Sequence, residues 1–96
     1  MGDWIAPRIV CKDGMSLSVQ ASQYHYCTPR EDNAEPYLEK EVGYIRDVDG
    51  TSIAPPIEWT LYADGEFPSS VYGYVPVELI EEFIKKHGGI QKEALP

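Results

Sequence analysis

The chain has 96 residues, of which 43% are hydrophobic and 25% charged, and these values are typical of one small globular domain rather than of a disordered segment. Sixteen acidic residues against eight basic ones give a formal net charge of −8. This balance argues against unaided binding to nucleic-acid phosphates, which needs clustered Lys and Arg, and it permits a basic protein partner. An acidic surface also keeps a small protein in solution without any further role.

The first ten residues carry Asp3, Pro7 and Arg8 where a secretion signal would need an apolar core. No apolar run in the sequence approaches the length of a membrane span. We therefore expect a cytoplasmic protein whose two cysteines, Cys11 and Cys27, are reduced thiols.

The first part of the chain predicts an N-terminal arm and two strands within a single domain of residues 1–96. Residues 1–7 are expected to form the arm, and residues 8–11 a first strand. The sequence "KDGM" predicts a turn, because Asp-Gly favours tight reversals. The following stretch "MSLSVQAS" alternates strictly, so that Leu17 and Val19 point to the core while Ser and Gln side chains point to the solvent.

The middle of the chain predicts a loop followed by three more strands. "TPREDNAEP" has the composition of a loop, and "EVGYIR" that of a short strand, which "DVDG" ends with a turn. "IEWTLYA" alternates again and is expected to be a strand, with Ile57, Trp59 and Leu61 on its core face. After the turn "DGEFPSS", "VYGYV" predicts a last strand with Tyr72 and Tyr74 on one side.

The stretch "PVELIEEFIKKHGG" predicts an amphipathic C-terminal helix. Pro76 suits the first helical position, acidic residues occupy the first turns and basic residues the last, and two glycines supply the stop. The predicted fold is therefore α+β, an antiparallel sheet of four to five strands with one C-terminal amphipathic helix packed on it. We expect the helix to bury Ile80, Phe83 and Ile84 against Leu17, Val19, Trp59 and Leu61, and to expose Glu81, Glu82 and Lys85.

Tyrosines give the sequence its clearest candidate for a binding surface. The chain has seven of them, and Tyr24 with Tyr26 and Tyr72 with Tyr74 form pairs at the i,i+2 spacing of one strand face. Neighbouring strands would bring the four rings into one patch, with Arg30 beside it to hold an anion. Rigid aromatic rings are favoured in recognition surfaces, although tyrosines also cover sheets simply with their hydroxyls in water.

The tract "YHYC" leaves a metal site open as an alternative. His25 and Cys27 would share one face of an unbroken strand, and Cys11 and His87 could supply further zinc ligands. The spacing matches no standard zinc motif, and burial as an ordinary core cysteine with a hydrogen-bonded histidine is the favoured explanation. The first hairpin leaves the direction of Cys11 open: a two-residue turn pairs Val10 with Leu17 and turns Cys11 outward, whereas a three-residue turn pairs Cys11 with Leu17 and turns it inward.

The same tract contains a possible nucleophile and base, Cys27 and His25. Neighbouring side chains on one strand face rarely align for attack and proton transfer, and the sequence has no evident oxyanion loop. We therefore expect no enzymatic activity, no catalytic residue and no cofactor.

Several pieces of the sequence resemble a family of small, uncharacterised proteins encoded in bacteriophage and prophage genomes. The matching pieces are "SVQAS" with "YHYC" and Pro-Arg, then "EVGY", and finally "VYGYVPVELIEEFI" followed by "HGG". They fall within residues 13–30, 41–44 and 71–89, about half of the chain. The resemblance implies a phage accessory protein acting in the cytoplasm of a host bacterium.

Three functional hypotheses follow for the chain. The first is a non-catalytic phage accessory protein that binds a host protein, as an inhibitor of a host defence or regulatory complex. The second is a binder of a small anionic molecule such as a nucleotide on the tyrosine-rich face, and the third is a zinc protein or enzyme using Cys11, His25 and Cys27. The first and second place binding at Tyr24, Tyr26, Arg30, Tyr72 and Tyr74.

Overall fold

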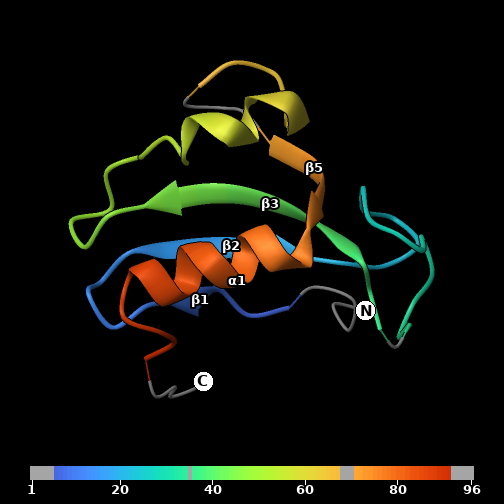
Figure 1. Ribbon diagram of the computed structural model, residues 1–96, viewed down its shortest axis with the longest axis horizontal. Coiled ribbons are helices and arrows are strands. Elements are labelled where there is room, and N and C mark those ends of the chain that lie inside the picture. The colour runs from blue at the N-terminus through green and yellow to red at the C-terminus, as the bar shows by residue number, and fades with distance from the viewer. Residues whose placement is uncertain (1–5, 35, 68–70, 92–96) are drawn as a thin grey trace.

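The computed structural model describes residues 6–34, 36–67 and 71–91 of the chain. Within these residues, five strands form one antiparallel sheet in the order β1-β2-β3-β5-β4, and an α-helix follows the last strand (Figure 1). The elements in chain order are β1 (Ile9–Val10), β2 (Ser16–Gln20), β3 (Glu39–Arg46), the 3₁₀ helix η1 (Ile57–Tyr62), β4 (Ala63–Asp64), β5 (Val71–Pro76) and α1 (Val77–Lys86). The predicted α+β fold is confirmed.

Some predicted segments fall partly outside the described residues. Residues 1–5 of the predicted arm, residue 35 of the predicted loop and residues 68–70 of the predicted turn lie there. The last part of the arm is described, and Ala6 exchanges two hydrogen bonds with the side chain of Gln20, at 2.7 and 3.0 Å. Among the described residues, no helix combines the length and the apolar character needed to span a membrane.

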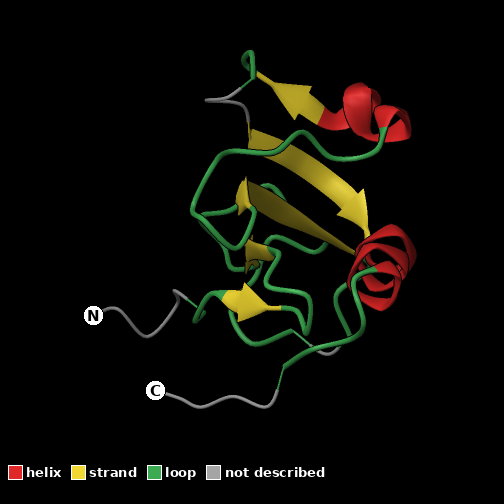
Figure 2. Cartoon of the chain, turned by 90° about the vertical axis from the view of Figure 1, so that its left-hand side faces the viewer, coloured by secondary structure: helices red, strands yellow, loops and turns green. Residues whose placement is uncertain are grey.

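The helix α1 lies on one face of the sheet, as Figures 1 and 2 show from two directions. Its apolar stripe faces the strands, so that Ile80 and Phe83 are each only 4% exposed. Glu81, Glu82 and Lys85 are exposed, as predicted. The helix ends at Lys86, and Gly88 and Gly89 then adopt the left-handed conformation expected of a C-terminal stop.

The core between α1 and the sheet is built around a row of aromatic rings. The ring centroid of Trp59 lies 5.7 Å from that of Phe83 and 6.1 Å from that of Tyr72. Trp59 is 2% exposed, and it joins the helix to the strand side of the core. The other buried members of this cluster are Cys11, Leu17, Val19, Val42, Ile45, Val75 and Ile80.

The segment expected to be a strand at residues 57–63 forms the 3₁₀ helix η1 over residues 57–62, and only Ala63 lies in a strand, so this part of the prediction is wrong. The sequence Pro55-Pro56 precedes the segment, and Trp59 N donates to Pro56 O at 2.9 Å to start a helical turn. Trp59 is buried, whereas Ile57 and Leu61 are each 85% exposed. The expectation that Leu61 packs against the helix is therefore also wrong.

Two bulges interrupt the ladders that join β3 to its neighbours, and both occur at a Gly-Tyr pair. Between β2 and β3, the register shifts where Gly43 is followed by Tyr44, and between β3 and β5 it shifts where Gly73 is followed by Tyr74. Both tyrosines have positive φ, at 53° and 57°, in the left-handed region that residues other than glycine seldom adopt. Each bulge adds one residue to its strand and so changes which side chains point to the core.

The first hairpin follows neither of the two registers considered from the sequence. Ile9 pairs with Leu17, and Cys11 N donates to Met15 O at 2.7 Å, so the turn consists of residues 12–14. Cys11 is fully buried in the core, and it lies on the same side as Ile9 and Leu17. The apolar pattern therefore gave the correct direction for Cys11, although the pairing was wrong.

The end of α1 is fastened to this hairpin turn. Asp13 N donates to His87 O at 3.2 Å, and His87 Nδ1 donates to Oδ2 of Asp13 at 2.6 Å. The other carboxylate oxygen of Asp13 accepts a hydrogen bond from Met15 N at 2.9 Å. These bonds, first that of Met15 and then that of His87, hold the pKa of Asp13 below its ordinary value of 3.8.

We expect Asp13→Asn to lower the stability of the protein at neutral pH and to have a smaller effect in acid. Because the folded-state pKa of Asp13 is lowered, the stabilisation from its charge is complete above the ordinary value of 3.8 and is lost as the pH falls through the folded-state pKa. Asn keeps an oxygen for Met15 N but loses the charge. Urea unfolding of both proteins between neutral and acidic pH measures the difference, and a difference that stays constant down to the lowest pH would contradict this role.

Candidate functional site

The strand β2 ends at Gln20, and the chain then turns sharply around Ser22. Ser22 is 1% exposed, its Oγ accepts a hydrogen bond from Tyr24 N at 3.0 Å, and this Oγ lies 2.7 Å from His25 Nδ1. Side-chain oxygens of Ser that bond to the backbone two residues later are typical of turns. The tract "YHYC" is therefore a turn. The alternation had predicted that the strand continues through it, and that prediction is wrong.

A second contact fixes this turn to the loop that follows it. Gln23 donates its backbone N–H and its side-chain Nε2 to the two carboxylate oxygens of Asp32, at 3.0 and 2.9 Å. The hydrogen bond from the backbone of Gln23 is the main cause that lowers the pKa of Asp32 below its ordinary value. The segment that carries the candidate tyrosines is thus held at both ends.

The turn carries Tyr26 across β3 to the bulge in β5. Tyr74 N donates to Tyr26 O at 2.9 Å, and Tyr26 N donates to Oε1 of Glu41 at 2.9 Å. The two rings stack, with centroids 5.9 Å apart and an angle of 28° between their planes. The guanidinium carbon of Arg30 lies 5.5 Å from the centroid of the Tyr26 ring, within the range of a cation–π contact. We call Arg30, Tyr26 and Tyr74 the tyrosine stack.

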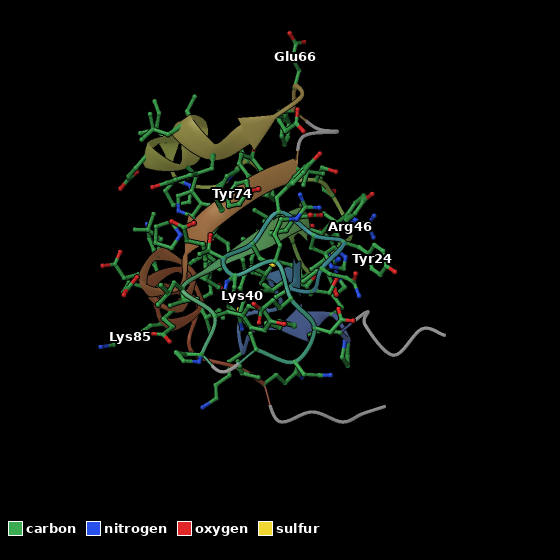
Figure 3. All side chains as sticks on the ribbon, turned by 90° about the vertical axis from the view of Figure 1, so that its right-hand side faces the viewer. Tyr24, Lys40, Arg46, Glu66, Tyr74 and Lys85 are labelled. Carbon is green, nitrogen blue, oxygen red and sulfur yellow. The ribbon has the colours of Figure 1, made fainter. Side chains whose placement is uncertain are left out.

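The tyrosine stack lies on the protein surface. Tyr26 and Tyr74 are each 41% exposed, and Tyr24 is 62% exposed in the same turn. Figure 3 shows Tyr74 on β5 and Tyr24 on the side of the sheet away from α1. Three of the predicted binding residues are thus brought together, and Tyr24 is exposed in the same segment.

Tyr72 is buried, so the prediction that it shares a face with Tyr74 is wrong. Tyr72 is 7% exposed and packs edge-on against Trp59 in the core. The bulge at Gly73 and Tyr74 inserts an extra residue, and this residue breaks the alternation on which the prediction relied. Tyr72 therefore helps to hold β5 in place, and Tyr74 faces outward.

A surface hollow of about 390 Å³ lies beside the tyrosine stack. Its lining residues are Tyr26, Leu61, Tyr62, Asp64, Gly73 and Tyr74. We call it the tyrosine hollow. Because Leu61 is 85% exposed at its edge, the hollow joins aromatic and aliphatic surface in one place. Asp64 gives the hollow a negative charge, so its lining suits a neutral or cationic group better than an anion.

The four residues of the alternative zinc site lie at two different places in the fold. Cys11 and His87 belong to the end where the first hairpin meets the end of α1, and Cys11 pairs there with Ile90. His25 and Cys27 belong to the turn after β2. Throughout the part of the chain that the structure describes, no three His, Cys, Asp or Glu side chains are placed to share a metal ion.

His25 and Cys27 both serve the turn in this structure. Cys27 is 1% exposed, and its single S–H is shared between the carbonyl oxygens of Ser22 and Pro29, which lie 3.2 and 3.3 Å from Sγ. His25 Nδ1 is engaged by the hydroxyl of Ser22. The other thiol, Cys11, is buried in the core, and this burial raises its pKa and keeps it protonated. These contacts account for the residues as packing and turn-forming groups.

Sequence analysis missed three residues that shape the tyrosine stack. The Ser22 hydroxyl accepts a hydrogen bond that shapes the turn, and the Glu41 carboxylate accepts one from the backbone N–H of Tyr26. Gly73 has no side chain, so Tyr26 can lie directly on β5. One signal was present in the sequence: an isolated glycine within a strand pattern often marks a bulge or a close approach of two segments. Both "VGYI" and "YGYV" carry that signal.

No family model, no curated protein and no solved structure matches the chain.

We expect Gly73→Ala to break the tyrosine stack. A Cβ at position 73 would lie 2.8 Å from Tyr26 Cβ, which is too close for two carbons, so Tyr26 must move off β5. Such overpacking costs about 1–3 kcal/mol of unfolding free energy. NMR shifts of the Tyr26 and Tyr74 ring protons report the loss of stacking, and urea unfolding reports the cost.

Gly43→Ala is the matched control, because Gly43 also precedes a bulge tyrosine. A Cβ there would meet Val71 Cγ2 at 3.8 Å, an ordinary contact. We expect unchanged tyrosine ring shifts and a stability equal to that of the parent or slightly greater, since Gly inside a strand is less favourable than Ala by about 0.5–1 kcal/mol. Equal ring-proton shifts in the two variants would show that Tyr26 does not need a glycine at position 73 to pack on β5.

Proposed function

We propose that this chain is a non-catalytic phage accessory protein that binds a host protein and inhibits a host defence or regulatory complex. The observation that carries the proposal is the tyrosine stack with Leu61 beside it. It is a fixed, exposed aromatic surface on the side of the molecule that α1 leaves free. The phage origin rests on the sequence resemblance, and the cytoplasm of the host bacterium is the compartment that it implies.

The geometry of the tyrosine stack supports a role in binding to a protein. Tyr26 and Tyr74 are held by backbone hydrogen bonds and by each other, so little conformational entropy remains for a partner to remove. Exposed aromatic side chains and Arg are enriched among the residues that dominate protein–protein affinity.

Charge indicates the chemistry of the partner. The chain carries a net −8, and Asp64 lines the tyrosine hollow. A partner surface that combines apolar groups with Lys or Arg would complement both the aromatic rings and the negative field. We therefore expect complex formation to slow as the salt concentration rises, because screening weakens the attraction.

Affinity capture from host lysates with matched variants tests this function. Tyr74→Asn removes the ring from the tyrosine stack, and Tyr44→Asn removes an equally placed bulge tyrosine at φ 53° outside it. Asn tolerates the left-handed conformation, so both variants should fold. We expect the parent and Tyr44→Asn to retain one stoichiometric partner and Tyr74→Asn to lose it. The proposal fails if no such partner appears in infected or uninfected lysates, or if Tyr74→Asn captures it equally well.

The tyrosine hollow supports a second candidate, the binding of a small molecule such as a nucleotide. Its volume of about 390 Å³ and its aromatic walls can accommodate a flat ring. Arg30, the expected anion partner, is not among the residues that line the hollow, whereas Asp64 is. The base of a nucleotide is therefore a better candidate than its phosphate for the group that enters the tyrosine hollow. NMR titration with adenosine tests this function: saturable shifts confined to Tyr26 and residues 61–64 and 71–76 support it, and their absence removes it.

A further inference from the structure

A second hollow, of about 540 Å³, lies on the sheet face opposite α1, at the end of the molecule where two hairpin turns meet. The turns of residues 12–14 and 47–50 form its rim, and they touch each other where Gly14 meets Val48. Arg8, Lys12 and Arg46 all line this hollow, so three of the eight basic residues of the chain gather in one place. We call it the arginine hollow.

The strand pairing fixes the two arginines. Arg46 stands opposite Ser16 in the ladder between β2 and β3, and Arg8 Nε donates to Ser16 Oγ at 2.9 Å. A terminal nitrogen of Arg8 also donates to the carbonyl oxygen of Tyr44, at the bulge in β3. The guanidinium carbon of Arg46 lies 5.9 Å from the centroid of the Tyr44 ring. Partial burial and the nearby charge of Arg46 lower the pKa of Arg8, although it remains protonated.

Neither guanidinium group has a carboxylate partner among the described residues. In residues 6–34, 36–67 and 71–91, no Asp or Glu forms an ion pair with Arg8 or Arg46. Two carboxylates also line the hollow, so its three cations exceed its anions by one charge. Asp13 binds Met15 N and His87, and Asp47 Oδ1 accepts hydrogen bonds from the backbone N–H groups of Asp49 and Thr51, at 2.9 and 3.0 Å.

We propose that the arginine hollow binds the phosphate group of a small phosphorylated molecule. Two like charges held side by side repel each other, and a dianion between them turns that repulsion into attraction. Guanidinium groups present paired donors that match the oxygens of a phosphate. The overall charge of −8 repels anions from the rest of the surface, so binding of phosphate requires this local set of cations.

NMR titration of the full chain tests the site, with inorganic phosphate and glycerol phosphate as probes and sodium chloride at matched ionic strength as the reference. We expect both probes to give saturable shifts in the amide signals of residues 12–16 and 46–50. Arg46→Gln should weaken the affinity at least about tenfold, because a hydrogen bond between charged groups contributes about 1.5–3 kcal/mol. Arg46 is exposed, so this substitution should leave the fold intact.

Lys85→Gln is the matched control. It removes the same charge from α1, on the side of the molecule opposite Arg46 (Figure 3), and we expect unchanged affinity. The proposal is overturned by shifts no larger than those with chloride, by equal weakening in the two variants, or by succinate binding as tightly as the phosphates. Because the tyrosine stack lies elsewhere, Arg46→Gln should still capture the host partner, so the two proposals can fail separately.

Discussion

Replacing Phe83 by Ala should remove about 3–5 kcal/mol of unfolding free energy, which is the usual cost of deleting a buried aromatic ring. Phe83 is 4% exposed and contacts Trp59 on one side and His87 on the other, with ring centroids 5.7 and 4.6 Å apart. The substitution would interrupt the aromatic row that fastens α1 to the sheet. The total free energy of unfolding of a small domain is only about 5–15 kcal/mol, so the variant should be close to unfolding.

Glu82→Ala is the control on the adjacent position of the helix. Glu82 is exposed, and even a formed ion pair at the i,i+4 spacing on a helix surface contributes at most about 0.5 kcal/mol. Urea unfolding of the two variants compares the faces of α1 directly. If Phe83→Ala unfolds at the same urea concentration as the parent, α1 is not docked, and its apolar stripe is free to bind a partner.

The second large effect is expected from Gly14→Ala. Gly14 has φ 95°, and a Cβ there would lie 2.6 Å from Val48 Cβ, an atom that cannot move without its backbone. The left-handed conformation costs about 1–2 kcal/mol for a residue with a side chain, and overpacking about 1–3 kcal/mol more. We expect a loss of about 2–5 kcal/mol of unfolding free energy, together with separation of the two turns at the rim of the arginine hollow.

Gly50→Ala separates the cost of the left-handed backbone from the cost of the contact with Val48. Gly50 has φ 84°, and a Cβ there would meet nothing within 4 Å, so this variant carries the backbone cost alone, about 1–2 kcal/mol. The difference between the two variants in denaturant unfolding therefore measures the contact between the turns. Equal losses of unfolding free energy in the two variants would mean that Val48 moves aside without cost and that the two turns do not stabilise each other.

The elements that could be predicted from sequence are those whose side-chain pattern matches their packing. The alternation around Leu17 and the apolar stripe of residues 77–84 each predict one buried face, and the structure confirms both. The prediction that the polar face of the first alternation is in solvent is wrong at Gln20 and Ser22, which are 8% and 1% exposed. The pattern at residues 57–63 misled because alternation there did not arise from a sheet face. Pro55 and Pro56 favour a helical turn, and Trp59 alone is buried in η1. In this segment the backbone preference set by the two prolines determined the structure, and the alternation of apolar residues did not.

The candidate site could be predicted in composition but not in geometry. Tyr26, Tyr74 and Arg30 do meet, although the strands that were expected to bring them together are not neighbours, since β3 lies between β2 and β5. A turn around Ser22 carries Tyr26 over to β5, and a bulge turns Tyr74 outward and Tyr72 inward. Turns and bulges depend on contacts distant in sequence, so strand periodicity could not reveal them.

The proposed function places the host partner on the tyrosine stack, on the side of the sheet that α1 does not cover. Hydrogen–deuterium exchange of the chain alone and in complex with its captured host partner tests this placement. We expect the complex to slow exchange in residues 24–30, 60–64 and 71–76 and to leave α1 unchanged. Slowed exchange in α1 with no change around Tyr26 and Tyr74 would exclude binding at the tyrosine stack and place the binding surface on the helix.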